Sequence, residues 1–86
     1  MQRNTIICIC NDYSKPVMTT IQCDQIIGNN EEIVFEIAKK FNGNTFIADT
    51  ITFNNAEDFW NFWNYIMKNY IKYFWYFPHL TPRNFF

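Results

Sequence analysis

The stretch FWNFWNYIMKNYIKYFWYF, residues 59–77, holds eleven of the eighteen aromatic residues in this chain of 86. Large apolar residues recur in it at offsets 0, 3, 4, 7, 11, 14, 15 and 18, the spacing of one face of an α-helix. Asn55 is the expected N-cap, with Asp58 three residues later as in a capping box, and Pro78 ends the pattern. We therefore predict an aromatic helix that begins after Asn55 and reaches Phe77. Its stripe consists of Phe59, Phe62, Trp63, Ile66, Tyr70, Tyr73, Phe74 and Phe77.

The same segment carries more rings than one helix face can bury. Small domains need aromatic side chains for their core, because each buries about 150–250 Å². That need explains the stripe, but several rings lie off it, and Trp and Tyr are enriched at binding hot spots. Trp60 can also widen the buried arc, since it lies three residues before Trp63. We predict a partner-binding surface made by Trp60, Tyr65, Trp75, Tyr76, Lys68, Lys72, Phe85 and Phe86.

Two strands are expected before any helix. TIICIC (5–10) is short, β-branched and almost wholly apolar, which favours a strand buried on both faces. NDYSKP (11–16) is rich in turn-forming residues and leads to VMTTIQCDQII (17–27), in which alternate side chains share a side. The two runs predict a β-hairpin with a loop of several residues.

A helix and a third strand are expected next. Within residues 28–43, Asn29 or Asn30 can cap the helix, and Gly43 can adopt the left-handed conformation that ends it. The predicted buried stripe is Ile33, Ile37 and Phe41, with Val34 and Ala38 beside it. Residues 44–53 alternate and predict a strand whose Ile47, Ile51 and Phe53 share one side.

These elements predict a single α+β domain over residues 1–86, in the order ββαβα, with residues 78–86 as a tail that can form an arm. The expected sheet has three strands, is mainly antiparallel and has the order 2-1-3. A helical crossover normally leaves the strands that it joins parallel. Strand one, lying between them, would then be antiparallel to both.

Composition excludes several classes of protein. With 49% hydrophobic and 17% charged residues the chain is expected to fold, and its net charge of −1 with scattered lysines disfavours an electrostatic nucleic-acid binder. Asn and Lys residues interrupt the aromatic segment too often for a membrane span, and the presence of only two lysines on its polar face disfavours an interfacial helix. Three cysteines without a signal peptide favour a reducing, cytoplasmic setting.

Catalytic and metal-binding motifs are not recognised. Cys8 and Cys10 are too close for a zinc knuckle, and neither Cys23 nor His79 restores the spacing. The cysteines are expected to behave as small hydrophobic residues. Only two glycines are present, too few for a phosphate-binding loop. We expect no enzyme activity, no metal and no cofactor.

The sequence predicts a non-enzymatic protein-binding module. The class expected is a small inhibitor or adaptor that blocks a larger intracellular protein by occupancy, such as phage-encoded anti-defence proteins and toxin-immunity proteins. The alternative is a module that binds single-stranded nucleic acid by stacking on Trp60, Tyr65 and Tyr76, with nearby lysines. We also expect a homodimer, with the second helix or the C-terminal tail in the contact. Two helices on one face of a three-stranded sheet would leave the other face uncovered.

Overall fold

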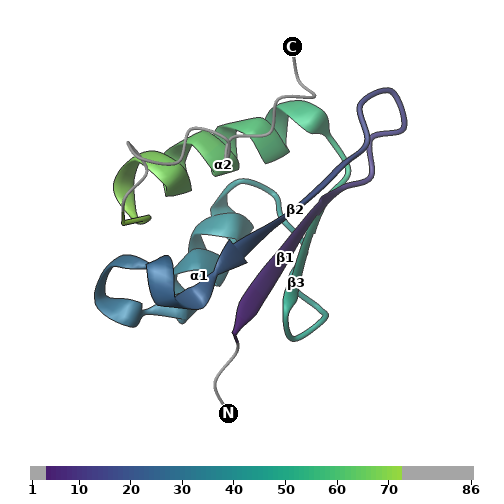
Figure 1. The fold of residues 1–86 in the computed structure, drawn as a ribbon. Coiled ribbons are helices and arrows are strands. Elements are labelled where there is room, and N and C mark those ends of the chain that lie inside the picture. Colours follow the sequence, from purple (N-terminus) through teal and green to yellow (C-terminus); the bar gives the residue numbers. More distant parts are fainter. Residues whose placement is uncertain (1–3, 73–86) are drawn as a thin grey trace.

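The computed structural model describes residues 4–72, and it has the predicted α+β fold with the element order ββαβα (Figure 1). The elements are β1 (Thr5–Cys10), β2 (Val17–Gln22), the 3-10 turns η1 (Cys23–Gln25) and η2 (Ile27–Asn29), α1 (Glu31–Lys40), β3 (Thr50–Phe53) and α2 (Ala56–Asn69). Expectations for residues 73–86, including the arm at 78–86, lie outside the described residues.

The three strands form one sheet in the predicted order, β2-β1-β3. β1 is antiparallel to β2, with Cys8 opposite Thr19. It is parallel to β3, with Cys8 opposite Ile51. The sheet is therefore mixed, and the expectation that β1 is antiparallel to both neighbours is wrong for β3.

The orientation of β3 follows from a chain reversal inside the segment that was predicted to be one strand. Asn44 and Thr52 exchange two backbone hydrogen bonds, of 2.7 and 3.0 Å, as an antiparallel bridge. The Thr50 N–H closes the turn between them by donating to the Ile47 carbonyl at 3.1 Å. Residues 44–46 therefore run opposite to β3. Ile47, expected on the same side as Ile51 and Phe53, is 61% exposed, whereas those two residues are buried.

α1 buries a slightly different stripe from the predicted one. Val34, Phe35, Ile37 and Ala38 are buried, whereas the predicted Ile33 and Phe41 are half-buried and pack at the margin of the core. The burial pattern is thus shifted toward Phe35. The helix begins after Asn30, whose side chain makes no capping hydrogen bond.

The end of α1 is a Schellman motif in which Asn42, rather than Gly43, has the left-handed conformation, with φ 68°. The Gly43 N–H donates to the Ala38 carbonyl at 2.7 Å, and the Asn42 N–H donates to the Lys39 carbonyl at 3.1 Å. Gly43 is required for another reason. A Cβ there would lie 2.8 Å from the Ala38 oxygen and 2.9 Å from the Phe53 ring.

α2 is capped as predicted but is shorter than the aromatic periodicity suggests. The Asn55 side chain accepts hydrogen bonds from the Glu57 and Asp58 N–H groups at 2.8 and 3.3 Å. The helix ends at Asn69, not near Pro78. After it, the Ile27 N–H donates to the Tyr70 carbonyl at 2.7 Å, so the chain leaves the helix to pair with the segment after β2.

Both helices lie on one face of the sheet (Figure 1). Phe59, Phe62 and Trp63 of α2 are fully buried there. The Phe53 ring of β3 packs against Phe59 and Phe62, with centroids 5.7 and 5.1 Å apart. Burial along β1 alternates, because every second residue is only half-buried. The prediction that β1 is buried on both faces is therefore wrong within the described residues.

Candidate protein-binding surface

The face of the sheet opposite the helices is not covered by any other described helix or strand. Successive side chains of a strand point to opposite faces, and the strand register therefore identifies the residues on this side. We call this surface the open face. Its residues are Thr5, Ile7, Ile9, Met18, Thr20, Gln22, Thr50 and Thr52, of which Thr50, in the edge strand β3, is buried.

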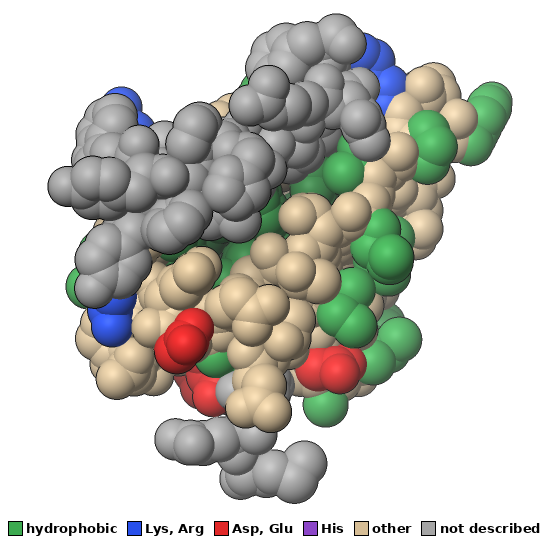
Figure 2. Space-filling view, in the orientation of Figure 1, with side chains coloured by type: hydrophobic (Ala, Val, Ile, Leu, Met, Phe, Trp, Pro, Cys, Tyr) green, Lys and Arg blue, Asp and Glu red, His purple; other side chains and the backbone are tan. Residues whose placement is uncertain are grey.

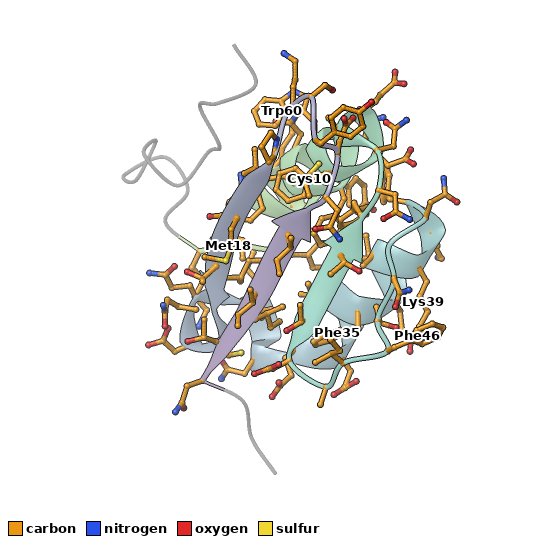
Figure 3. The ribbon with its side chains drawn as sticks, turned by 90° about the vertical axis from the view of Figure 1, so that its right-hand side faces the viewer. Cys10, Met18, Phe35, Lys39, Phe46 and Trp60 are labelled. Carbon is orange, nitrogen blue, oxygen red and sulfur yellow. The ribbon has the colours of Figure 1, made fainter. Side chains whose placement is uncertain are left out.

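The open face carries no charged side chain. β1, β2 and β3 contain only apolar residues, threonines, cysteines and one glutamine. In Figure 3 the strands lie in front of both helices, so this face is turned to the viewer, with Met18 at the β2 side of the sheet. Met18 is 72% exposed, and Ile7 and Ile9 are half-buried between the flanking strands. The polar residues of this face are uncharged threonines and one glutamine, and its apolar residues are Ile7, Ile9 and Met18.

Further apolar side chains project from loops near the sheet. Tyr13, in the loop between β1 and β2, is 95% exposed, and Phe46, in the segment before β3, is 92% exposed. Figure 2 shows hydrophobic side chains along the right-hand side of the molecule, the side to which the open face is turned. Tyr, Phe and Met are among the residue types enriched in the cores of protein interfaces.

The size of the open face limits what it can do alone. Three strands about 4.8 Å apart and about five residues long, at about 3.3 Å per residue, span roughly 250 Å² in projection. A standard protein interface buries about 800 Å² per partner. A stable complex would therefore need the neighbouring loops or the edge of the sheet in addition to the open face.

The predicted surface on α2 is only partly exposed. Trp60 is half-buried and packs against the core. Tyr65 is 42% exposed, and its ring lies 5.7 Å from that of Phe41 and 6.0 Å from that of Tyr70. Five residues at about 100° each place Trp60 and Tyr65 about 140° apart around the helix. The two rings therefore do not form one continuous surface on α2.

The two predicted lysines differ in their surroundings. Lys68 is exposed in the last turn of α2. Lys72 is half-buried, and its Nζ donates to the Asp24 carbonyl at 3.4 Å. Four predicted residues lie outside the described part of the chain: Trp75, Tyr76, Phe85 and Phe86.

The cysteines face the core rather than a reactive site. Cys8 and Cys10 are buried beneath the helices, and burial raises the pKa of the Cys8 thiol far above its ordinary value. Cys8 thus stays protonated, whereas a thiolate is the nucleophilic form. Cys23 is half-buried, with its Sγ 4.0 Å from a Glu31 carboxylate oxygen. Residues 4–72 contain no cluster of three or more side chains suited to a metal ion.

Asp12 joins the β1–β2 loop to the start of α2. One carboxylate oxygen accepts hydrogen bonds from the Ser14 hydroxyl at 2.6 Å and its N–H at 3.1 Å, and the other accepts from the Ala56 N–H at 3.0 Å. These bonds, the Ser14 hydroxyl first, hold the pKa of Asp12 below its ordinary value. Both oxygens of this carboxylate are therefore used to hold the loop and the helix together.

Sequence reasoning missed the most exposed apolar residues. Tyr13 lies among turn-forming residues, and Phe46 follows a glycine and two polar residues, so each appears where an exposed loop is expected. The sequence showed that Met18 and its neighbours in the strand point to alternate sides, but it could not show which side the helices cover. The aromatic cluster in residues 59–77 directed attention to α2, most of whose described rings are buried.

Comparison with models of known protein families, with curated proteins and with solved structures finds no match to this chain. None of the helices described for residues 4–72 has both the length and the apolar character of a membrane span.

Proposed function

We propose that this protein is a non-enzymatic binding module that blocks a larger intracellular protein by occupying part of its surface. The observation that carries this proposal is the open face, an uncharged sheet surface without a covering layer among the described elements. Burial of such a surface against a partner gains hydrophobic free energy without the desolvation of any charge. The exposed rings of Tyr13 and Phe46 supply further anchoring groups nearby.

The side chains of the open face support occupancy rather than chemistry. Its polar members are Thr hydroxyls and the Gln22 amide. The Thr50 hydroxyl donates a hydrogen bond to the neighbouring Asp49 carboxylate at 3.0 Å, and residues 4–72 contain no cluster suited to a metal ion. We place the protein among small inhibitors of the phage anti-defence or toxin-immunity kind, acting in the cytoplasm. Its size and its three cysteines, none of which forms a disulfide within the described residues, support that assignment.

The distribution of positive charge favours a protein partner over single-stranded nucleic acid. Within the described part of the chain, lysines occur in the β1–β2 loop, at the end of α1 and around the end of α2, and β1, β2 and β3 carry none. Binding of a nucleic-acid backbone needs a cationic groove beside the stacking rings.

The proposal is tested by capture from cell lysate on the immobilised full-length chain, followed by mass spectrometry and direct binding of the purified partner. Met18→Glu and Ile9→Glu each place a charge on the open face, and Asn64→Glu places the same charge on an exposed position of α2. Melting curves confirm that each variant is folded. We expect the two open-face variants to lose about tenfold or more in affinity, or about 1.4 kcal/mol, with Asn64→Glu unchanged.

Three results would contradict the proposal. One is the capture of no protein, and another is equal affinity in all three variants. The third is tight oligonucleotide binding that weakens steeply with salt, which would favour the nucleic-acid alternative.

A further inference from the structure

The two edges of the sheet differ within the described residues. At the β3 edge, the Thr52 N–H and carbonyl are both paired with Asn44, so the chain covers its own edge there. At the other edge lies β2, which is hydrogen-bonded to β1 on one side only. No backbone group of residues 4–72 pairs with the outer side of β2.

The residues of β2 with outward-facing backbone groups can be identified from the hydrogen bonds at its end. In an antiparallel pair, hydrogen-bonded and non-hydrogen-bonded residues alternate. The Cys23 N–H donates to the Asn4 carbonyl at 2.9 Å, so Cys23 faces β1, as do the odd-numbered residues of β2. Met18, Thr20 and Gln22 therefore direct their N–H and carbonyl groups away from β1, at the free edge.

β2 lacks the devices that normally protect such an edge. Proteins blunt exposed edges with charged side chains, prolines, bulges or very short strands. β2 has six residues in unbroken register with β1, no charged side chain and no proline. An unprotected edge of this kind is a template for another strand.

We propose that β2 is a self-association edge, which pairs antiparallel with β2 of a second copy of this chain across a two-fold axis at Thr20. In that register Thr20 lies opposite Thr20 of the second copy, and Met18 lies opposite Gln22. All three outward-facing residues then form hydrogen-bonded pairs, giving about six backbone hydrogen bonds. The inference is independent of the proposed function, because it rests on the edge of the sheet and not on its open face.

A second copy of this chain supplies an uncharged strand that can pair with this edge, so no unrelated partner strand has to be assumed. Antiparallel pairing of identical strands about Thr20 places residues of equal parity opposite each other, so the two open faces become continuous and both sets of helices lie on the opposite side. No charges meet, since β2 has none, and a net charge of −1 per chain gives little long-range repulsion. About six hydrogen bonds fall within the usual range of about 10 ± 5 for protein interfaces.

Light scattering coupled to gel filtration, over a range of micromolar concentrations, tests the association. We expect the full-length protein to approach twice the 10.5 kDa mass of one chain as concentration rises. Thr20→Lys places two ammonium groups opposite each other at the two-fold axis, which is destabilising in a strand pair. It should give a folded monomer, whereas Asn64→Lys, with the same change of charge on exposed α2, should remain a dimer.

Thr20→Cys in a Cys23→Ser background tests the register. Opposite residues of a hydrogen-bonded antiparallel pair have Cα atoms about 5.5 Å apart, within the range of about 4.4–6.8 Å that a disulfide requires. Mild oxidation should therefore give a covalent dimer with the wild-type circular dichroism spectrum. The matched Asn64→Cys variant in the same background should stay mainly uncrosslinked.

Amide hydrogen exchange shows whether the outer side of β2 forms the contact between the two copies. We expect the Met18, Thr20 and Gln22 amides to be protected in the dimer and to exchange rapidly in Thr20→Lys. A wild-type chain that stays at the mass of one copy, or a dimer that Thr20→Lys leaves intact, would overturn the proposal. Protection of these amides in a monomeric wild-type chain would also overturn it, because another part of the same chain would then occupy the edge.

Discussion

The two faces of the sheet are built from the same three strands, yet they have opposite surroundings. On β1, Ile6 is fully buried under the helices, whereas the next residue, Ile7, is half-buried on the open face. The two side chains are identical, so their difference comes only from the layer above them. The sequence of an apolar strand therefore shows which positions lack charged side chains, but not which of these positions are covered by a helix.

Trp63→Ala should disrupt the packing of the helices on the sheet, and we expect this substitution to have the largest effect on stability. Trp63 is fully buried, and its ring stacks on that of Phe59 with centroids 6.0 Å apart. Truncation of a core Trp or Phe to Ala costs about 3–5 kcal/mol, close to the whole stability of a small domain. Urea denaturation measures the change. Tyr65→Ala, at a partly exposed ring of the same helix, is the control, and equal losses in both variants would contradict the assignment of faces.

Ile6→Ala and Ile7→Ala compare the two faces at adjacent positions with the same chemical change. Deletion of a buried Ile side chain costs about 2–5 kcal/mol. Because Ile7 is half-buried, its truncation should cost less than half as much as that of Ile6. The free energies of unfolding come from denaturant titrations at low protein concentration. Equal costs would mean that the open face is covered in solution.

Gly43→Ala tests how tightly the end of α1 packs against the sheet. The added methyl group would lie 2.8 Å from the Ala38 carbonyl oxygen, a backbone atom that cannot move aside easily. Overpacking of this kind typically costs about 1–3 kcal/mol. Thermal unfolding measures the loss. Asn42→Gly is the neighbouring control and should be near neutral, since φ 68° suits glycine; a neutral Gly43→Ala would show that the helix end can shift.

Asp12→Asn tests the attachment of α2 to the β1–β2 loop, and we expect the smallest effect. The folded-state pKa of Asp12 is lowered, so its contribution is fully present above the unfolded-state pKa and is lost as pH falls through the folded-state pKa. Wild type should therefore melt higher than Asp12→Asn at neutral pH, and the two melting temperatures should converge below about pH 4. A difference that is constant from neutral to acid pH would contradict a role for the ionised carboxylate.

The sequence alone determined the local elements and their order. TIICIC and VMTTIQ were recognised as a hairpin because both have strand-like patterns and are joined by turn-forming residues. Asn55 was recognised as a cap because only a few side chains can accept hydrogen bonds from the first turn of a helix. The central position of β1 also followed from sequence, since it is the most apolar strand.

Tertiary contacts set the direction of β3, the end of α2 and the covered side of the sheet. Residues 44–53 alternate like one strand, but pairing of Asn44 with Thr52 reverses the chain. The aromatic period continues past Asn69, yet the Tyr70 carbonyl accepts a hydrogen bond from the Ile27 N–H. Each outcome depends on a hydrogen-bond partner distant in sequence or on the layer above a strand. The periodicity of the sequence shows which side chains lie on the same side of an element. It does not show which segment, distant in sequence, will pair with that element or pack on it.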